Sequence, residues 1–282
     1  MSAPKLDLDQ PAARPLRPAI DWGDVALATV TFVAYAVVLL PIVVIIISSF
    51  NPSSALTFPP QRLSMRWYFE FFETADMVSG FIWSLVIAVI AAATSVVLGT
   101  LAAVALARGR FPFKGAINAF LLTPLIFPGL ILGVALLLYF QMTHAPILAR
   151  IATAHILLGV PFVVRSVLSS LDLFDIRIEE AAIIHGASPV RAFLKVTLPS
   201  IQPGIVAGAV FAFVVSFGEV NATLFLTGPG LSTLPIQIYS QIQYGSEQVI
   251  VAAASTLQMG LVVALIVILE KVFGLSITTP TR

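Results

Sequence analysis

Six long apolar stretches divide this chain and determine what it can fold into. A helix needs about 20 apolar residues to cross a hydrocarbon core of ~30 Å, and each stretch is long enough. They predict an all-α integral membrane protein with six transmembrane helices. The stretches cover residues 25–49, 81–107, 117–140, 147–171, 204–226 and 249–273.

The composition agrees with this class. The chain is 59% hydrophobic and 10% charged, with a mean hydropathy of +1.01, whereas soluble domains carry about 25% charged residues. A net charge of +1 gives no electrostatic basis for binding nucleic acid. The absence of cysteine excludes disulfides, thiol catalysis and cysteine-ligated metals.

The start of the first stretch defines the domain boundary that we expect. Residues 1–24 combine several prolines with mixed charges and are expected to form a mobile tail, which leaves 25–282 as the transmembrane domain. The first stretch is too long for a signal peptide, whose apolar region has about 7–15 residues. In the fourth stretch, Arg150 and Arg165 lie near the ends, where their side chains can reach headgroups.

One charged segment, residues 172–203, interrupts the apolar pattern. Asp175 is a good N-cap, and Gly186 stands where a glycine would end the helix, which predicts a short helix over about 176–185. Ser188 before Pro189 predicts the start of a second helix, which Pro199 is expected to close. Charged side chains of this segment, Glu179 among them, are expected to lie on its exposed rim.

The spacing inside this segment resembles the EAA loop of ABC-importer permeases, E-A-A-x3-G-x9-I-x-L-P, with valine in place of the usual isoleucine. Residues 172–203 are therefore called the EAA segment below. The matching positions, which the resemblance identifies as ATPase-coupling residues, are Glu180, Ala181, Ala182, Gly186, Val196, Leu198 and Pro199.

The resemblance implies a type I ABC importer permease fold and a partner that hydrolyses ATP. The chain has no phosphate-binding loop, so ATP and Mg²⁺ would be used by a separate cytoplasmic ATPase dimer, and no cofactor is expected in this chain. One EAA copy implies a second permease subunit, identical or homologous, to complete the pathway. A periplasmic binding protein would deliver the solute, and the protein would lie in the bacterial inner membrane.

Orientation follows from the distribution of lysine and arginine, which favour the cytoplasmic side. The two termini and the EAA segment fall on the positive side and are expected to be cytoplasmic. The residues on that side are Lys5, Arg14, Arg17, Arg108, Arg110, Lys114, Arg165, Arg177, Arg191, Lys195, Lys271 and Arg282; Arg62 and Arg66 lie opposite, with Arg150 near them.

Most of the chain is similar to the spermidine/putrescine-type permeases, a branch related to ferric-iron, sulfate and thiamine importers. The matching passages are LSMRWY at 63–68, VALARGRFPF at 104–113 and TGPGLSTLPIQIYS at 227–240. The resemblance implies a polyamine-like solute; ferric iron, sulfate, thiamine or another small solute is the alternative. A six-helix secondary carrier or channel is a more distant alternative that leaves the complete EAA pattern unexplained.

Two remaining features concern the pathway and the outer face. Glu219 is the carboxylate well inside a predicted span, and a charge there should face water or a partner. It is a candidate pathway residue together with Ser216, Asn221 and Thr223, although a carboxylate tied to a neighbouring helix is an equal alternative. The aromatic stretch 65–73 is expected to form a helix at the outer membrane interface.

No catalytic or metal site is predicted. The three histidines fall in an outer loop, a span and the EAA segment, which favours structural roles over a metal centre. No Ser, His and Asp set has the elbow or the spacing of a membrane protease, so the predicted activity is transport rather than covalent chemistry.

Overall fold

The computed structural model describes residues 22–55 and 57–273, which form helices joined by loops and turns. The chain divides into two parts between Val44 and Ile45, inside the first helix. Residues 1–21 of the predicted tail lie outside the described residues, and residues 22–24 belong to this helix.

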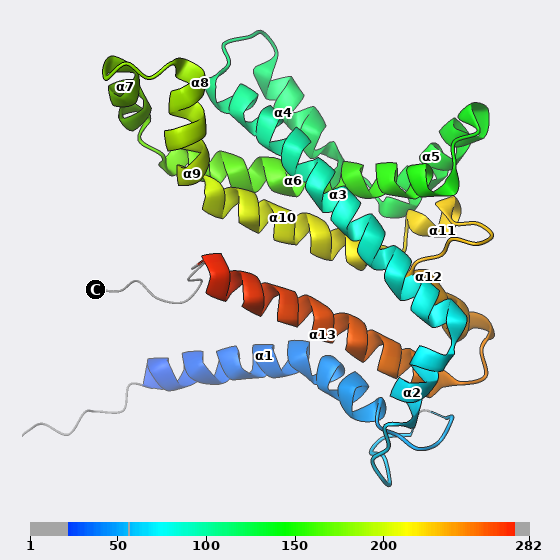
Figure 1. Ribbon diagram of the computed structural model, residues 1–282. Helices are drawn as coiled ribbons and strands as arrows, with labels where there is room; N and C mark the ends of the chain where they lie inside the picture. Colours follow the sequence, from blue (N-terminus) through cyan, green and yellow to red (C-terminus); the bar gives the residue numbers. More distant parts are fainter. Residues whose placement is uncertain (1–21, 56, 274–282) are drawn as a thin grey trace, which may run out of the picture. The chain divides into compact units, whose positions relative to one another are not determined.

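The helices follow the order of the apolar stretches (Figure 1). Four of them, α1, α3, α6 and α13, are each long and apolar enough to cross a membrane, and two bent helix pairs raise the number of spans to six if each pair counts as one. The elements are α1 Trp22–Ser48, α2 Arg66–Glu73, α3 Ala75–Arg108, α4 Lys114–Leu122, the 3₁₀ turn η1 Thr123–Leu125, α5 Gly129–Thr143, α6 Ile147–Leu173, α7 Ile176–Ile184, α8 Pro189–Ala192, the π-helical turn η2 Phe193–Thr197, α9 Leu198–Ser200, α10 Gln202–Phe217, α11 Thr223–Leu226, α12 Leu234–Tyr244 and α13 Gln248–Phe273.

The third predicted span is broken rather than continuous. Its two halves, Lys114–Leu125 and Gly129–Thr143, meet at an angle of 100°. Pro124 lies in the 3₁₀ turn and Pro128 precedes α5, and neither residue can donate a backbone hydrogen bond to continue a helix. The prolines therefore end one helix and start another within the stretch that the sequence predicted as one span.

The fifth predicted span is shorter than expected, because α10 ends at Phe217 and not at residue 226. Gly218 follows the last helical residue, and the carboxylate of Glu219 then accepts hydrogen bonds from the backbone N–H groups of Ala222 and Thr223. Those bonds start the separate short helix α11. The apolar sequence continues through this break, so hydropathy alone does not reveal it.

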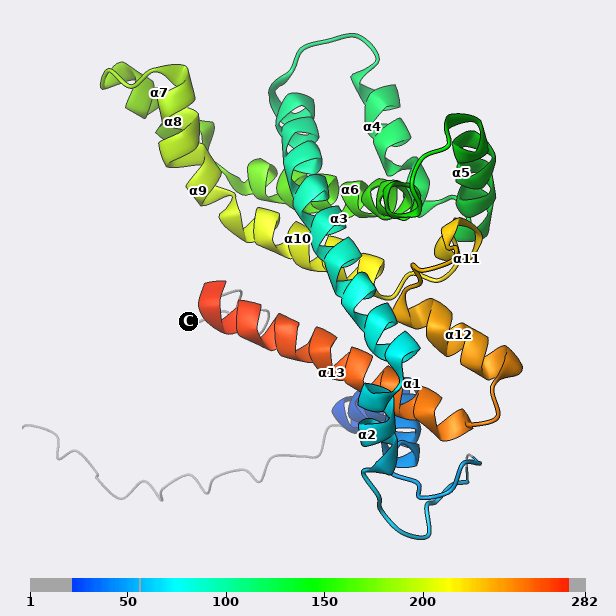
Figure 2. The same ribbon diagram turned by 45° about the vertical axis from the view of Figure 1, so that its right-hand side comes forward.

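The centre of the larger part is the packing of α3, α6 and α10 on one another (Figures 1 and 2). Val163 of α6 is fully buried between the other two helices. A Cβ atom at Gly99 of α3 would lie 2.7 Å from Val163 Cβ, and one at Gly208 of α10 would lie 2.8 Å from Val163 Cα. Glycine at these positions permits the close backbone approach that is typical of membrane helix pairs.

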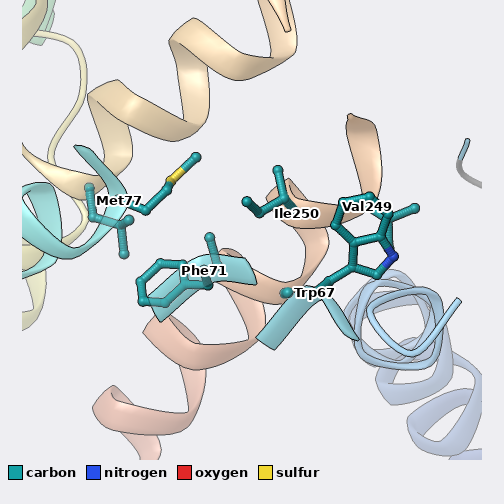
Figure 3. Close-up of a cluster of buried hydrophobic side chains, with 8 residues drawn as sticks. Trp67, Phe71, Met77, Val249 and Ile250 are labelled. Carbon is teal, nitrogen blue, oxygen red and sulfur yellow. The ribbon is translucent and has the colours of Figure 1, made fainter. Parts of the chain in front are cut away.

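A second cluster joins α2 to α13 (Figure 3). Trp67 and Phe71 are buried against Val249 and Ile250, and the indole N–H of Trp67 donates to the Asn51 carbonyl over 2.7 Å. The predicted aromatic helix therefore exists, and its largest side chain belongs to the protein core. Its position at the outer membrane interface stays a prediction.

Candidate functional site

The EAA segment folds as a helix, an elbow and a second helix at one end of α6 and α10, with α11 near the opposite end of α10 (Figures 1 and 2). The predicted N-cap of α7 is confirmed, because Oδ1 of Asp175 accepts from the N–H of Arg177 over 3.0 Å. The first helix ends at Ile184, close to the expected residue.

The elbow at Gly186 has the geometry that the sequence predicted. Gly186 has a φ of +92°, in the left-handed region that disfavours side chains. The N–H of Ala187 donates to the carbonyl of Ala182 over 3.0 Å, and the N–H of Gly186 donates to that of Ile183 over 2.9 Å. These two bonds are the pair that defines the Schellman motif at a helix end.

The second helix starts as predicted but does not stop at Pro199. The Ser188 hydroxyl accepts from the N–H of Arg191, and Pro189 occupies the first turn. The chain then remains helical through the π turn η2 and α9 to Ser200, and bends by 64° before α10. A wider π turn just before Pro199 accommodates a residue that lacks the N–H for a normal helical bond.

The predicted coupling residues lie on a surface that this chain leaves largely uncovered. Four of these seven residues are exposed, and three are half-buried. Large apolar side chains stand beside them, including Ile184, 84% exposed, and Val190, 69% exposed. The exposed residues are Glu180, Ala181, Gly186 and Pro199, and the half-buried ones are Ala182, Val196 and Leu198.

Glu179 contradicts the expectation of a rim charge, because it is buried beneath this surface. Arg108, the last residue of α3, donates from Nη1 to Oε1 over 2.9 Å and from Nη2 to Oε2 over 2.6 Å. Thr197 of η2 donates its hydroxyl proton to the same carboxylate and accepts from Arg108 Nη2 over 3.2 Å. The three side chains form a closed triangle, called the Arg108 clamp below.

The clamp holds Glu179 in its charged form. Burial raises the pKa of this carboxyl, but the hydrogen bonds from Arg108 and Thr197 and the positive charge of Arg108 outweigh it, so the pKa lies below its ordinary value. The Arg108 guanidinium also lies 5.5 Å from the centre of the Phe193 ring.

The sequence did not reveal the clamp. Glu179 and Glu180 are neighbours in a helix and point in directions about 100° apart, and only Glu180 belongs to the recognised motif. Arg108 is separated from Glu179 by 71 residues, so no local spacing connects them. A signal that the sequence does offer is Arg108 itself, a charged residue that directly follows a long apolar stretch.

Three of the four candidate pathway residues belong to a second polar cluster, at the end of α10. Glu219 Oε2 accepts from the hydroxyl and the N–H of Thr223 over 2.6 and 2.9 Å. His155 of α6 bonds Ser216 through Nδ1 at 2.7 Å and Thr223 through Nε2 at 2.8 Å. Ser216, Glu219 and Thr223 are buried together, whereas Asn221 is exposed. The sequence predicts a structural role for His155, and its partners here are those of a satisfied core residue.

This arrangement bears on the two alternatives for Glu219. In this conformation the carboxylate is 8% exposed and tied to the next turn of its own chain. A role in lining the pathway stays a prediction, which requires the turn to open or its side chain to be reached from the pathway.

The chain matches known proteins along most of its length. Residues 95–274 match the family model described as the binding-protein-dependent transport system inner membrane component. The putrescine transport system permease PotI of Escherichia coli strain K12 is 37% identical over 230 residues, which cover 79% of this chain and 81% of PotI. The spermidine/putrescine permease PotC of the same strain is 33% identical over 238 residues, 84% of this chain and 89% of PotC.

Solved structures give the same fold. A chain of a bacterial ABC transporter involved in importing the acidic polysaccharide alginate superposes with a TM-score of 0.65, covering 92% of this chain and 97% of that chain. The sequence identity in this comparison is 13%, so the likeness concerns the fold alone.

Proposed function

Because this chain belongs to the family of binding-protein-dependent transport system inner membrane components, we propose that its EAA segment binds the ATPase that drives import. The protein is a multi-pass permease of the bacterial inner membrane, a transport component and not an enzyme. In this proposal it forms half of the pathway, and a second permease subunit forms the other half. ATP and Mg²⁺ are bound by the ATPase dimer, and a periplasmic binding protein delivers the solute.

The observation that carries the proposal is the two-sided character of α7. Its inner side is fixed to α3 through Glu179, while its outer side presents Glu180, Ala181 and exposed isoleucines such as Ile184. An exposed apolar surface with a charged rim is typical of a protein-binding site. A groove on a cytoplasmic ATPase is the partner that this family implies.

Site-specific crosslinking tests this contact, because the chain has no native cysteine. Ala181→Cys should form a crosslink to the co-purified ATPase when a short thiol-to-amine reagent is added, and ATP should alter its yield. Ser54→Cys, exposed between α1 and α2, is the matched control and should not react with the ATPase. Equal crosslinking from the two positions would remove the assignment.

We propose a polyamine-like solute, supported by the identity to PotI and PotC. The binding protein encoded with this permease should then bind putrescine or spermidine in a ligand screen. Preferred binding of ferric iron, thiamine or another small solute would reassign the cargo and leave the transport class intact.

One observation favours an anion such as sulfate as a second candidate. Arg165 of α6 lies about 12 Å from the end of this helix, counting 1.5 Å per residue, and is exposed. It has no ion-pair or hydrogen-bond partner within the described part of the chain. It borders a surface pocket of about 440 Å³ with the hydroxyl residues Ser166, Ser169 and Ser170. Guanidinium and hydroxyl groups together suit an anion.

Uptake measurements separate the two cargo classes. If the solute is an anion that passes Arg165, Arg165→Gln should slow its uptake, whereas Arg110→Gln in the loop after α3 should not. Unchanged uptake in Arg165→Gln would mean that this side chain reaches toward headgroups and does not serve the pathway.

A further inference from the structure

The Arg108 clamp joins three segments that are distant in the sequence at one end of the permease. Arg108 ends α3, Glu179 lies on the buried side of α7, and Thr197 belongs to the π turn before α10. Because α3 has 34 residues, it is about 51 Å long and extends beyond a ~30 Å hydrocarbon core. Its last residue can therefore reach the EAA segment outside the core.

The main packing contacts of α7 lie within its own segment, with α8 and η2. In contrast, α3 packs along α6 and α10 and also against α12 and α2. The bidentate pair between Arg108 and Glu179 is thus a direct polar link from α7 to the helix around which the larger part of the chain is packed.

We propose that the Arg108 clamp transmits movement of α7 to α3, so that Arg108 and Glu179 are positioning residues for the coupling of ATP hydrolysis to transport. This inference rests on the proposed docking of the ATPase to the EAA segment. Without the clamp, α7 can follow the ATPase by flexing at the 64° bend before α10 while α3 stays in place. The ATPase would then turn over without moving the solute.

The geometry of the clamp suits the transmission of a movement in a defined direction. A planar guanidinium bonded to both carboxylate oxygens fixes the relative orientation of the two side chains, which a single hydrogen bond cannot do. Thr197 closes the triangle and ties the π turn to the same carboxylate. A lysine at position 108 keeps the charge but not the two parallel bonds, so Arg108→Lys isolates the contribution of geometry.

The test is the coupling ratio, the amount of solute accumulated per ATP hydrolysed, in vesicles that contain permease, ATPase and loaded binding protein. Arg108→Gln and Glu179→Gln should keep ATPase activity and lower the ratio by about tenfold or more, within the range usual for coupling between two sites. Arg108→Lys should also lower it. Arg110→Gln removes an exposed arginine two residues away and should leave the ratio unchanged.

A mechanical rescue tests whether a covalent link between α3 and α7 can replace the ion pair. In the double variant Arg108→Cys with Glu179→Cys, a bifunctional thiol reagent should restore the coupling ratio, although it restores no charge. A normal ratio in Arg108→Gln would overturn the proposal, and so would a double variant that stays uncoupled after crosslinking.

Failure of the docking proposal is detected separately. It would appear as loss of the Ala181→Cys crosslink in a chain with an intact clamp. A retained crosslink with normal coupling in Arg108→Gln would reject the clamp and keep the docking.

Discussion

Glu219 and His155 are joined through a single hydroxyl: Oγ1 of Thr223 lies 2.6 Å from Glu219 Oε2 and 2.8 Å from His155 Nε2. Because the hydroxyl donates its proton to the carboxylate, it accepts from Nε2, which must carry a proton. In a neutral imidazole, Nδ1 then accepts from Ser216. In this tautomer the His155 ring joins α6 to Ser216 at the end of α10 and to Thr223 of α11.

The first prediction follows from these bonds. Glu219→Gln replaces one acceptor oxygen by a donor facing N–H and O–H groups, so it should lower the free energy of unfolding by about 1–3 kcal/mol. Thermal unfolding in detergent measures this loss, and Glu73→Gln, at an exposed carboxylate, is the control. Normal stability together with slower uptake of a cationic solute would favour the pathway role instead.

The elbow of the EAA segment gives a second prediction. Gly186→Val forces a β-branched residue to a φ of +92°, which costs about 1–3 kcal/mol of local strain although no atom would obstruct the Cβ. We expect solute-stimulated ATPase activity to be lost while the permease still inserts. Gly115→Val adds the same side chain in open space without a left-handed φ and should retain activity. Wild-type transport by Gly186→Val would remove the elbow from the coupling route.

A pair of glycine variants tests the central packing. Gly208→Ala places a Cβ 2.8 Å from Val163 Cα and should destabilise the protein by about 1–3 kcal/mol through overpacking. Gly260→Ala, in α13, meets no atom within 4 Å and should stabilise it by up to about 1 kcal/mol through helix propensity. The unfolding temperatures of the two variants should therefore shift in opposite directions. Equal shifts of the unfolding temperature in both variants would contradict the close contact of α6 and α10.

The Arg108 clamp predicts a specific pH dependence. The pKa of Glu179 is lower in the folded protein than its ordinary value of 4.5, so its contribution to stability is present above 4.5 and is lost as the pH falls through the folded pKa. A fluorophore on Ile184→Cys should keep constant anisotropy from pH 8 to pH 5 and become mobile in more acidic buffer. With Glu179→Gln added, it should be mobile throughout. A transition near neutral pH would contradict a charged, clamped carboxylate.

Orientation remains a prediction of the charge distribution. Cysteines at Ser54 and Ser246, both exposed, should react with an impermeant thiol reagent added outside intact cells. A cysteine at Ser188 should be protected, as should one at Ser2, which lies outside the described residues. Labelling of position 188 from outside would invert the assignment.

Local signals predicted the features that depend on neighbouring residues. Asp175, Ser188 and Gly186 each act through backbone groups within a few positions, so capping rules were sufficient to place α7 and the start of α8. The apolar stretches likewise located the four long helices α1, α3, α6 and α13, because the length that crosses a bilayer is fixed.

Features that depend on distant contacts or on backbone direction were missed. The prolines indicate a kink in the third span, but local proline chemistry does not give its size, an angle of 100°. The hydropathy pattern does not reveal the end of α10, because Glu219 stands in an apolar run. Its carboxylate accepts hydrogen bonds from the backbone of the next turn, which hydropathy does not indicate. The sequence predicts a rim position for Glu179 because its partner, Arg108, belongs to another helix and gives no local signal.

The most direct test of the transport account is solute accumulation in sealed vesicles that contain this permease, its partner permease and the ATPase, with the binding protein on the side from which the solute is taken. We predict accumulation against a gradient only when ATP, the ATPase and the binding protein are all present. Accumulation by the permease alone, driven by an ion or solute gradient, would contradict the account and identify a secondary carrier.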